Sequence, residues 1–151
     1  MITFRKITKK NYEEVLQLQL LPETGEMLME STCNVIVRSV FENRIESLKA
    51  IYNNNIMVGL ICFYPTRKNK IFIDYFLISK DNRGKGLGKK SLQKAINYIK
   101  REYKPSTIEL WADNPIAIHL YKSLGFKITK KEEIILKDIK YNDYKLELHL
   151  K

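Results

Sequence analysis

A short stretch of alternating glycines and basic residues is the part of this sequence best suited to bind a phosphate. Within residues 81–90 these positions are Arg83, Gly84, Lys85, Gly86, Gly88 and Lys89. The stretch follows the apolar run Ile71–Ser79 and enters a helical pattern that continues to about Glu102. The first turn of a helix has unpaired main-chain N–H groups and a positive dipole end, and glycine lets a phosphate approach them. The segment predicts a pyrophosphate site, and a glycine-rich turn without a ligand is the alternative.

Two common phosphate-binding motifs do not fit this stretch. A P-loop requires GxxxxGK[ST], but Arg83 stands where its first glycine belongs and Lys90 stands where Ser or Thr is needed. A dinucleotide-binding turn requires GxGxxG, which differs from the spacing of Gly84, Gly86 and Gly88. The sequence therefore favours another phosphate-containing ligand.

Two motifs together carry a family resemblance. Arg83–Gly88 matches [RQ]xxGx[GA], and Asn114–Phe126 matches Nxx[AS]xxxYxxxGF. In this order and at this separation they are similar to the acetyl-CoA motifs of the GNAT superfamily of N-acetyltransferases. The resemblance extends over nearly the whole chain in the order of its predicted elements.

The resemblance implies that acetyl-CoA is the co-substrate, and the few, widely spaced histidines and cysteines lead us to expect no metal. It implies that the strand before the glycine turn pairs its main chain with the pantetheine arm, that the turn binds the pyrophosphate, and that the later motif contacts pantetheine and thioester. The implied cofactor-binding residues are Phe76, Leu77, Ile78, Arg83, Gly84, Lys85, Gly86, Leu87, Gly88, Lys89, Asn114, Ala117 and Tyr121.

Direct transfer of an acyl group to an amine needs a proton donor for the departing thiolate. By the resemblance this donor is Tyr121, because a phenol can protonate sulfur. The alternative is a tyrosine that only packs on a short helix. The main-chain N–H of Ile78 is a candidate to polarise the acyl carbonyl.

The reaction also needs a base to remove a proton from the amine. Asp74 is the first candidate, because it is a lone carboxylate within an apolar strand, although an ion pair with a nearby Lys or Arg would also explain it. Glu30 is the second candidate, with an exposed loop carboxylate as its alternative. Glu109 and Asp113 are weaker candidates that could act through water.

The acceptor is predicted from a further resemblance. Met29–Thr32 and Ile73–Ile78 are similar to segments of bacterial diamine and polyamine acetyltransferases of the spermine/spermidine type. The net charge of +10 opposes a polycationic acceptor at long range, but salt screens charges beyond about 8 Å, so carboxylates such as Glu23 and Glu26 could act locally. Protein N-termini, lysine side chains, aminoglycosides and amino acids remain alternative acceptors, and a coenzyme A-binding module without turnover is a further alternative.

The elements that must position these residues follow from periodicity. Strands are expected at residues 2–7, 47–53, 56–64, 71–79 and 107–112. The segments 126–130, 133–137 and 144–150 are expected to form two or three closing strands. Helices are expected at about 8–20, 31–42, 86–102 and 115–123. The predicted fold class is α/β (α+β): a mixed, mostly antiparallel sheet of six to seven strands flanked by about four helices, in a single domain over residues 1–151.

Composition narrows the function classes. The chain has two cysteines and two histidines without metal-ligand spacing, and its longest apolar run, Ile56–Tyr64, is too short for a membrane span. No nucleic-acid motif accompanies the basic charge. We therefore expect a cytoplasmic protein that binds neither nucleic acid nor a membrane. The resemblance adds the expectations of a small-molecule amine acceptor and of a homodimer.

Overall fold

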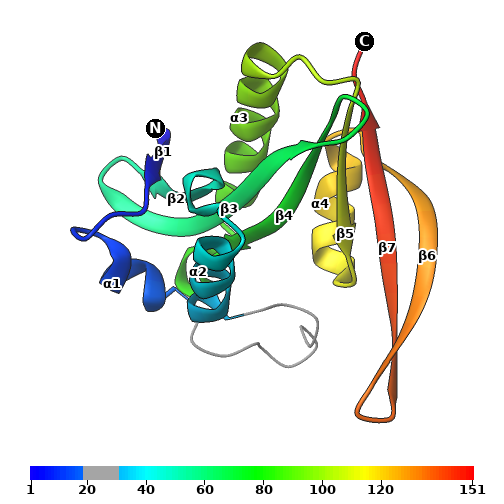
Figure 1. The fold of residues 1–151 in the computed structure, drawn as a ribbon, viewed down its shortest axis with the longest axis horizontal. Helices are drawn as coiled ribbons and strands as arrows, with labels where there is room; N and C mark the ends of the chain where they lie inside the picture. Colours follow the sequence, from blue (N-terminus) through cyan, green and yellow to red (C-terminus); the bar gives the residue numbers. More distant parts are fainter. Residues whose placement is uncertain (19–30) are drawn as a thin grey trace.

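A seven-stranded mixed sheet organises the computed structural model, which describes residues 1–18 and 31–151. The strand order is β1-β2-β3-β4-β5-β7-β6, and only β4 and β5 are parallel neighbours. The strands are β1 (Ile2–Lys6), β2 (Leu48–Asn53), β3 (Ile56–Thr66), β4 (Lys70–Ile78), β5 (Thr107–Ala112), β6 (Lys127–Leu136) and β7 (Ile139–His149). The described helices are α1 (Tyr12–Leu16), α2 (Thr32–Phe41), α3 (Leu87–Glu102) and α4 (Pro115–Ser123), with short 3-10 turns at Ile45–Ser47 and Lys80–Asn82. This architecture confirms the predicted fold class (Figure 1).

The two faces of the first four strands carry separate hydrophobic cores. On one face, residues such as Ile61 and Ile73 pack with Leu92 and Ile96 of α3. On the other, residues such as Leu60 pack with Val15 of α1 and Val35 of α2. Because β3 and β4 are covered on both faces, their sequences are apolar almost without interruption, as expected for central strands.

The helices differ in how well the sequence defines their ends. Helix α2 starts after Ser31, whose hydroxyl accepts a hydrogen bond from the Asn34 N–H at 3.2 Å. The helix expected to begin near residue 8 was misplaced: Thr8 and Asn11 form a turn, and α1 begins only at Tyr12. Its predicted end at residue 20 lies outside the described residues.

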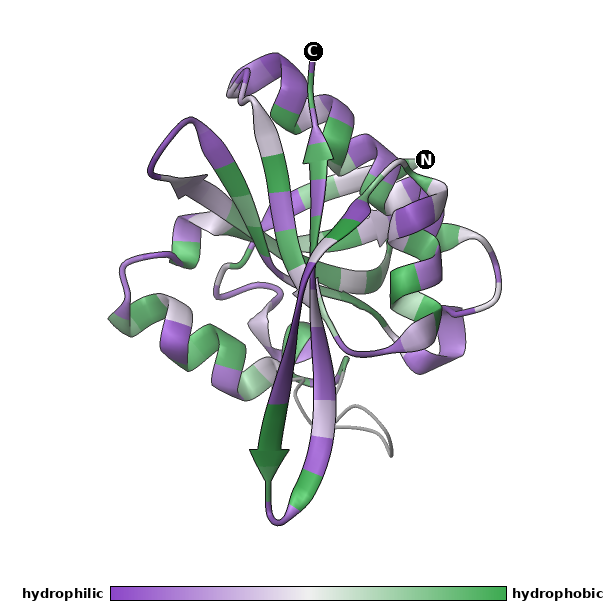
Figure 2. Cartoon of the chain, turned by 90° about the vertical axis from the view of Figure 1, so that its right-hand side faces the viewer, coloured by the Kyte–Doolittle hydropathy of each residue, from purple (hydrophilic) through white to green (hydrophobic). Residues whose placement is uncertain are grey.

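The last two strands form a long hairpin that inserts β7 between β5 and β6. The two segments expected at 126–130 and 133–137 are one continuous strand, β6, interrupted only by a register shift between Ile128 and Lys130. Figure 2 shows this hairpin extending beyond the body, with hydrophobic residues on either side of its hydrophilic tip. The insertion places β6 and β7 on the β5 side of the molecule.

Candidate active site between strands β4 and β5

Strands β4 and β5 form a fork. Their pairing joins Lys70–Phe72 to Thr107–Glu109, yet β4 continues to Ile78 and β5 to Ala112. A cavity of about 860 Å³ lies between the diverging parts, within the range of 300–1,000 Å³ usual for ligand pockets. Most of the predicted cofactor residues line it, namely Phe76, Leu77, Ile78, Arg83, Gly84, Gly86, Gly88, Lys89, Asn114, Ala117 and Tyr121.

A β-bulge at Asp74 shapes the β4 wall of the fork. Cys62 of β3 pairs with Tyr75 and Phe63 pairs with Ile73, which leaves Asp74 as the extra residue. A bulge shifts the alternation of side chains along a strand. Ile73 therefore packs on the α3 side, whereas Tyr75 packs on the α1 and α2 side.

The main chain at the end of β4 faces the cavity at alternate residues. The Ser79 N–H donates to the Val58 carbonyl at 2.9 Å, and the Leu77 carbonyl points at Gly59 of β3. Since successive residues of an antiparallel strand point their main-chain groups to opposite sides, Phe76 and Ile78 direct theirs toward the gap. The Ile78 carbonyl there accepts a hydrogen bond from Arg83 Nε at 2.9 Å.

The glycine turn leaves the first turn of α3 open to a ligand. Gly84 and Gly86 have φ angles of 73° and 72°, the left-handed region that favours glycine, and a Cβ at either would meet no protein atom within 4 Å. Gly86 is the N-cap and gives no side-chain hydrogen bond, and the first turn contains no acidic residue. The turn can therefore accommodate an anion, and its residues fit the diphosphate of coenzyme A.

Two predicted residues of this turn lie away from the cavity lining. Leu87 packs in the core beneath α3, and Lys85 Nζ binds the Asp81 carbonyl at 2.7 Å. Arg83 and Lys89 are the basic side chains of the turn that line the cavity.

Helix α4 starts and ends with motif residues. Asn114 is its N-cap, and its Oδ1 accepts from the N–H groups of Ile116 at 2.8 Å and Ala117 at 3.4 Å, with Pro115 at the first helical position. At the other end Gly125, with φ of 96°, turns the chain. The asparagine carbonyl oxygen is thus used by the helix itself.

Tyr121 is buried in the wall of the cavity. Its ring lies 5.8 Å from that of Phe126 between centroids, which explains the aromatic residue after Gly125. Burial raises the pKa of the Tyr121 phenol above its ordinary value. The group is therefore protonated at neutral pH and can donate a proton.

Asp74 lines the cavity and also forms an ion pair. Its Oδ2 lies 2.9 Å from a guanidinium nitrogen of Arg38 on α2, and its side chain is 16% exposed. Arg38 also approaches Glu42 at 3.6 Å. The ion pair foreseen as an alternative is present, and the carboxylate remains at the cavity wall. Glu30, the second base candidate, lies outside the described residues, as do Glu23 and Glu26.

Three carboxylates line the cavity on the β5 side: Asp113, Glu132 and Asp143, which we name the acidic cluster. Glu132 and Asp143 are directly opposite each other in the hairpin. Burial raises the pKa of Asp143, and the charges of Asp113 and Glu132 add to the effect. Burial also raises the pKa of Asp113. Glu132 and Asp143 were not anticipated, because only the β5-β7-β6 order brings them to the end of β5.

Glu109 does not belong to this cavity. It lies in a network with lysines on the neighbouring strands. Among the described residues no group of three or more His, Cys, Asp or Glu side chains could hold a metal ion. None of the described helices is long and apolar enough to cross a membrane.

Comparison with known proteins agrees with this geometry. The model of the acetyltransferase (GNAT) family matches residues 13–126. The spermine/spermidine N(1)-acetyltransferase of Bacillus subtilis (strain 168) is 26% identical over 152 residues, covering 91% of this chain and 99% of that protein.

Two solved structures share the fold. A GNAT family acetyltransferase from Elizabethkingia anophelis with acetyl-CoA bound has a TM-score of 0.68 at 19% identity, covering 99% of this chain and 98% of the other. A chimera of the spermidine N-acetyltransferase SpeG from Vibrio cholerae and hSSAT has a TM-score of 0.78 at 17% identity, covering 98% and 95%. The forked sheet, the glycine turn and the match over most of the chain lead to one conclusion: this protein belongs to the GNAT family of acetyltransferases.

Proposed function

We propose that this protein transfers the acetyl group of acetyl-CoA to a primary amine of a small polycation such as spermidine or spermine. The observation that carries the proposal is the lining of a single cavity. Arg83 and Lys89 line it from the turn after β4, whereas the acidic cluster lines it from the β5 side. This division of charge suits a cofactor with a diphosphate and an acceptor with several ammonium groups.

The acidic cluster supports a polycationic acceptor because the protein balances its charges only in part: Glu132 pairs with Lys130 at 2.5 Å. In the described part of the chain neither Asp113 nor Asp143 has an ion pair, and the pKa of each is raised by burial. Like charges at directly opposite positions of a hairpin destabilise it. An ammonium group bound between the carboxylates would remove this cost. The net charge of +10 does not prevent binding of a polycation, because salt screens its repulsion at long range and the carboxylates of the cluster attract the ligand locally.

Acetyl-CoA supplies the activated acyl group when bound. The open first turn of α3, with Arg83 and Lys89, would hold its diphosphate. Phe76 and Ile78 would hydrogen-bond its pantetheine arm, because their main-chain groups face the gap. The Ile78 N–H is also available to polarise the acyl carbonyl.

In the transfer step the amine nitrogen forms a bond to the acyl carbon while the carbon–sulfur bond breaks. Tyr121 donates a proton to the departing sulfur, consistent with its raised pKa. The proton lost by the amine goes to Asp74, to Glu30 or to water. Asp74 is our first choice because its carboxylate lines the same cavity.

A panel of acceptors tests this function. Thiol release from acetyl-CoA is measured with spermidine, spermine, a lysine peptide, a peptide with a free N-terminus, an aminoglycoside and free amino acids. We expect the highest kcat/KM for the polyamines and identify the acetylated amine by mass spectrometry. A preference for a peptide would show that the acceptor is a protein amine and not a polyamine. If the protein binds acetyl-CoA but no amine causes thiol release, it is a coenzyme A-binding module and not an enzyme.

Two further expectations remain predictions. Homodimer formation is tested by light scattering of the purified protein, and cytoplasmic location by fractionation of cells that express it.

A further inference from the structure

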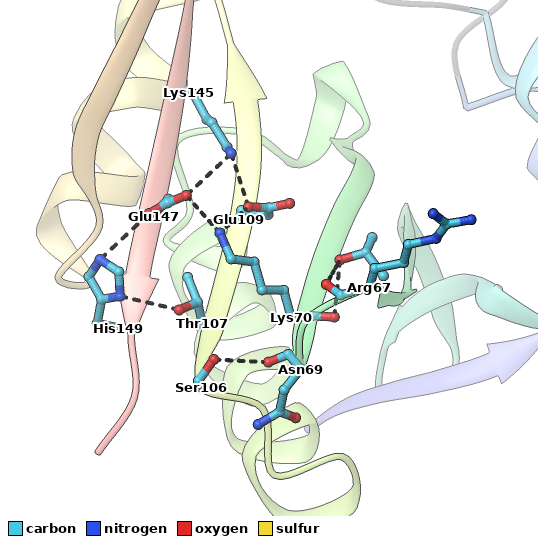
Figure 3. A network of polar contacts seen from close by, with 10 residues as sticks. Arg67, Asn69, Lys70, Ser106, Thr107, Glu109, Lys145, Glu147 and His149 are labelled. Carbon is cyan, nitrogen blue, oxygen red and sulfur yellow. Dashed lines mark hydrogen bonds and ion pairs between the residues drawn. The ribbon is translucent and has the colours of Figure 1, made fainter.

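An ionic network of four side chains lies on the sheet surface where β4, β5 and β7 run side by side. We name Lys70, Glu109, Lys145 and Glu147 the four-residue network (Figure 3). Lys70 Nζ lies 3.1 Å from Glu109 and 3.3 Å from Glu147, and Lys145 Nζ repeats both distances. The four side chains are between 13% and 27% exposed.

The network lies at the closed end of the fork. Lys70 is the first residue of β4 and pairs with Thr107, while Glu109 pairs with Phe72, the last β4 residue joined to β5. The Lys70 side chain extends across β5 and reaches Glu147 on β7. A main-chain link lies beside it, because the Ser106 N–H donates to the Asn69 carbonyl at 2.9 Å. The Ser106 hydroxyl donates to the same carbonyl at 3.1 Å. The base of the fork is therefore held by a few contacts, and Lys70 supplies its ionic ones.

The two lysines of the network connect different strands. Lys145 stands on β7, which pairs with β5 from Thr107 to Ala112, so its contacts join strands that a full ladder already holds. Lys70 stands on β4, which pairs with β5 only as far as Phe72. Of the four side chains, Lys70 is the one that ties β4 to the other two strands.

We propose that Lys70 is a positioning residue for the acetyl-CoA site: it holds β4 against β5 and β7 at the closed end of the fork and thereby sets the width of the gap. The inference rests on the proposed function, because it assigns the gap to the cofactor. In the absence of Lys70, Lys145 would be the one lysine left between Glu109 and Glu147. The closed end of the fork would then depend on the short parallel pairing and on the link between Ser106 and Asn69. The main-chain groups of Phe76 and Ile78 would then lose their fixed distance from the β5 side.

The charges of the network are consistent with this role. Hydrogen bonds to Glu109 and Glu147 raise the pKa of Lys70. Burial acts to raise the pKa of Glu147, but hydrogen bonds from Lys145 and Lys70 outweigh it and the pKa is lowered. Lys70 and Glu147 are therefore both ionised at neutral pH.

The test compares Lys70→Met with Lys145→Met, which removes two ion pairs of the same lengths to the same carboxylates. Calorimetry measures Kd for acetyl-CoA, and urea unfolding measures stability. We expect Lys70→Met to weaken acetyl-CoA binding at least about fivefold, the lower end of typical coupling between sites. Lys145→Met should stay within about twofold of wild type despite a similar loss of stability. Lys70→Arg, which keeps the charge, should restore most of the affinity.

Equal affinities of the two methionine variants would overturn the inference, as would full affinity of Lys70→Met. A wild-type chain that binds no acetyl-CoA would overturn the proposed function and the inference with it, so the two failures are distinguishable. If Lys70→Met does not fold, Lys70→Gln replaces it, and its affinity must fall relative to Lys145→Gln for the inference to stand.

Discussion

The carboxylate of Asp74 and the guanidinium of Arg38 are 2.9 Å apart, across the boundary between the sheet and α2. Asp74 is the bulged residue of β4 and lines the cavity. The ion pair therefore connects α2 to β4 at the bulge. The same carboxylate is thus both a partner of α2 and a candidate base. Removing one partner at a time can separate these roles.

Asp74→Asn should lower kcat by at least about 10²-fold, because general bases typically contribute 10²–10⁴-fold. Arg38→Met breaks the same ion pair but keeps the carboxylate, so its kcat should fall much less although its stability also falls. Thiol release under saturating substrates and urea unfolding of both variants check this. An equal loss of kcat in the two variants would show that turnover depends on the ion pair and that Asp74 is not the general base.

Asp143→Asn should weaken polyamine binding while it stabilises the fold. The ionised carboxylate is less stable in the folded chain, because burial, Asp113 and Glu132 raise its pKa. The neutral amide removes this cost, so the free energy of unfolding at pH 7 should rise by up to about 0.5 kcal/mol.

Loss of one charged contact should raise KM for spermidine about tenfold. Glu133→Gln is the control, since Glu133 is the neighbouring β6 residue and does not line the cavity. An unchanged KM for spermidine in Asp143→Asn would show that the acidic cluster does not bind the acceptor.

Gly86→Val should abolish acetyl-CoA binding. The residue has φ of 72° at the start of α3, and its Cβ would point into space free of protein atoms that we assign to the diphosphate. The left-handed conformation should also cost about 1–2 kcal/mol of stability. Lys104→Val is the control, because Lys104 has φ of 48° just beyond the other end of the same helix.

Both variants should lose stability, but calorimetry should detect acetyl-CoA binding only in Lys104→Val. If Gly86→Val keeps its affinity for acetyl-CoA, the diphosphate does not bind at this turn.

The buried Cys62 predicts an alkaline loss of stability. In the folded chain burial raises the pKa of this thiol to about 12, with a further contribution from the Asp74 charge. In the unfolded chain a thiol titrates near 8.5. Between these values only the unfolded state releases its proton, so the stability contribution is complete below about pH 8.5 and is lost as the pH rises toward 12.

Urea unfolding of wild type and Cys62→Ala at pH 7 and pH 10.5 measures this effect. The stability difference between the two proteins should shrink by about 3 kcal/mol at the higher pH, because the alanine variant lacks the titrating group. A difference that stays constant with pH would contradict it.

Local motifs made much of the cavity predictable from the sequence. The glycine turn before α3 and the run from Asn114 to Phe126 depend on neighbouring residues, positive φ angles and helix caps, which the sequence displays directly. The bulge at Asp74 could not be predicted, since it depends on the register between β3 and β4. The same holds for Asp143 beside Asp113, which requires β7 to insert between β5 and β6.

Contacts between residues far apart in sequence could not be predicted either, because they depend on the strand order. Lys70 and Glu147 are 77 residues apart in sequence and meet only through the strand order. The early helix was misplaced because the apolar residues after residue 11 fit a longer helix, whereas the Thr8–Asn11 hydrogen bonds form a turn first.

The most direct test of the account compares kcat with acetyl-CoA affinity in Tyr121→Phe. The phenol lines the cavity, and its raised pKa keeps its proton available for sulfur at neutral pH. We predict that thiol release with spermidine falls by about 10²-fold or more, while Kd for acetyl-CoA stays within about twofold of wild type. Turnover that survives the substitution unchanged would contradict the assignment of Tyr121 as the proton donor in the fork.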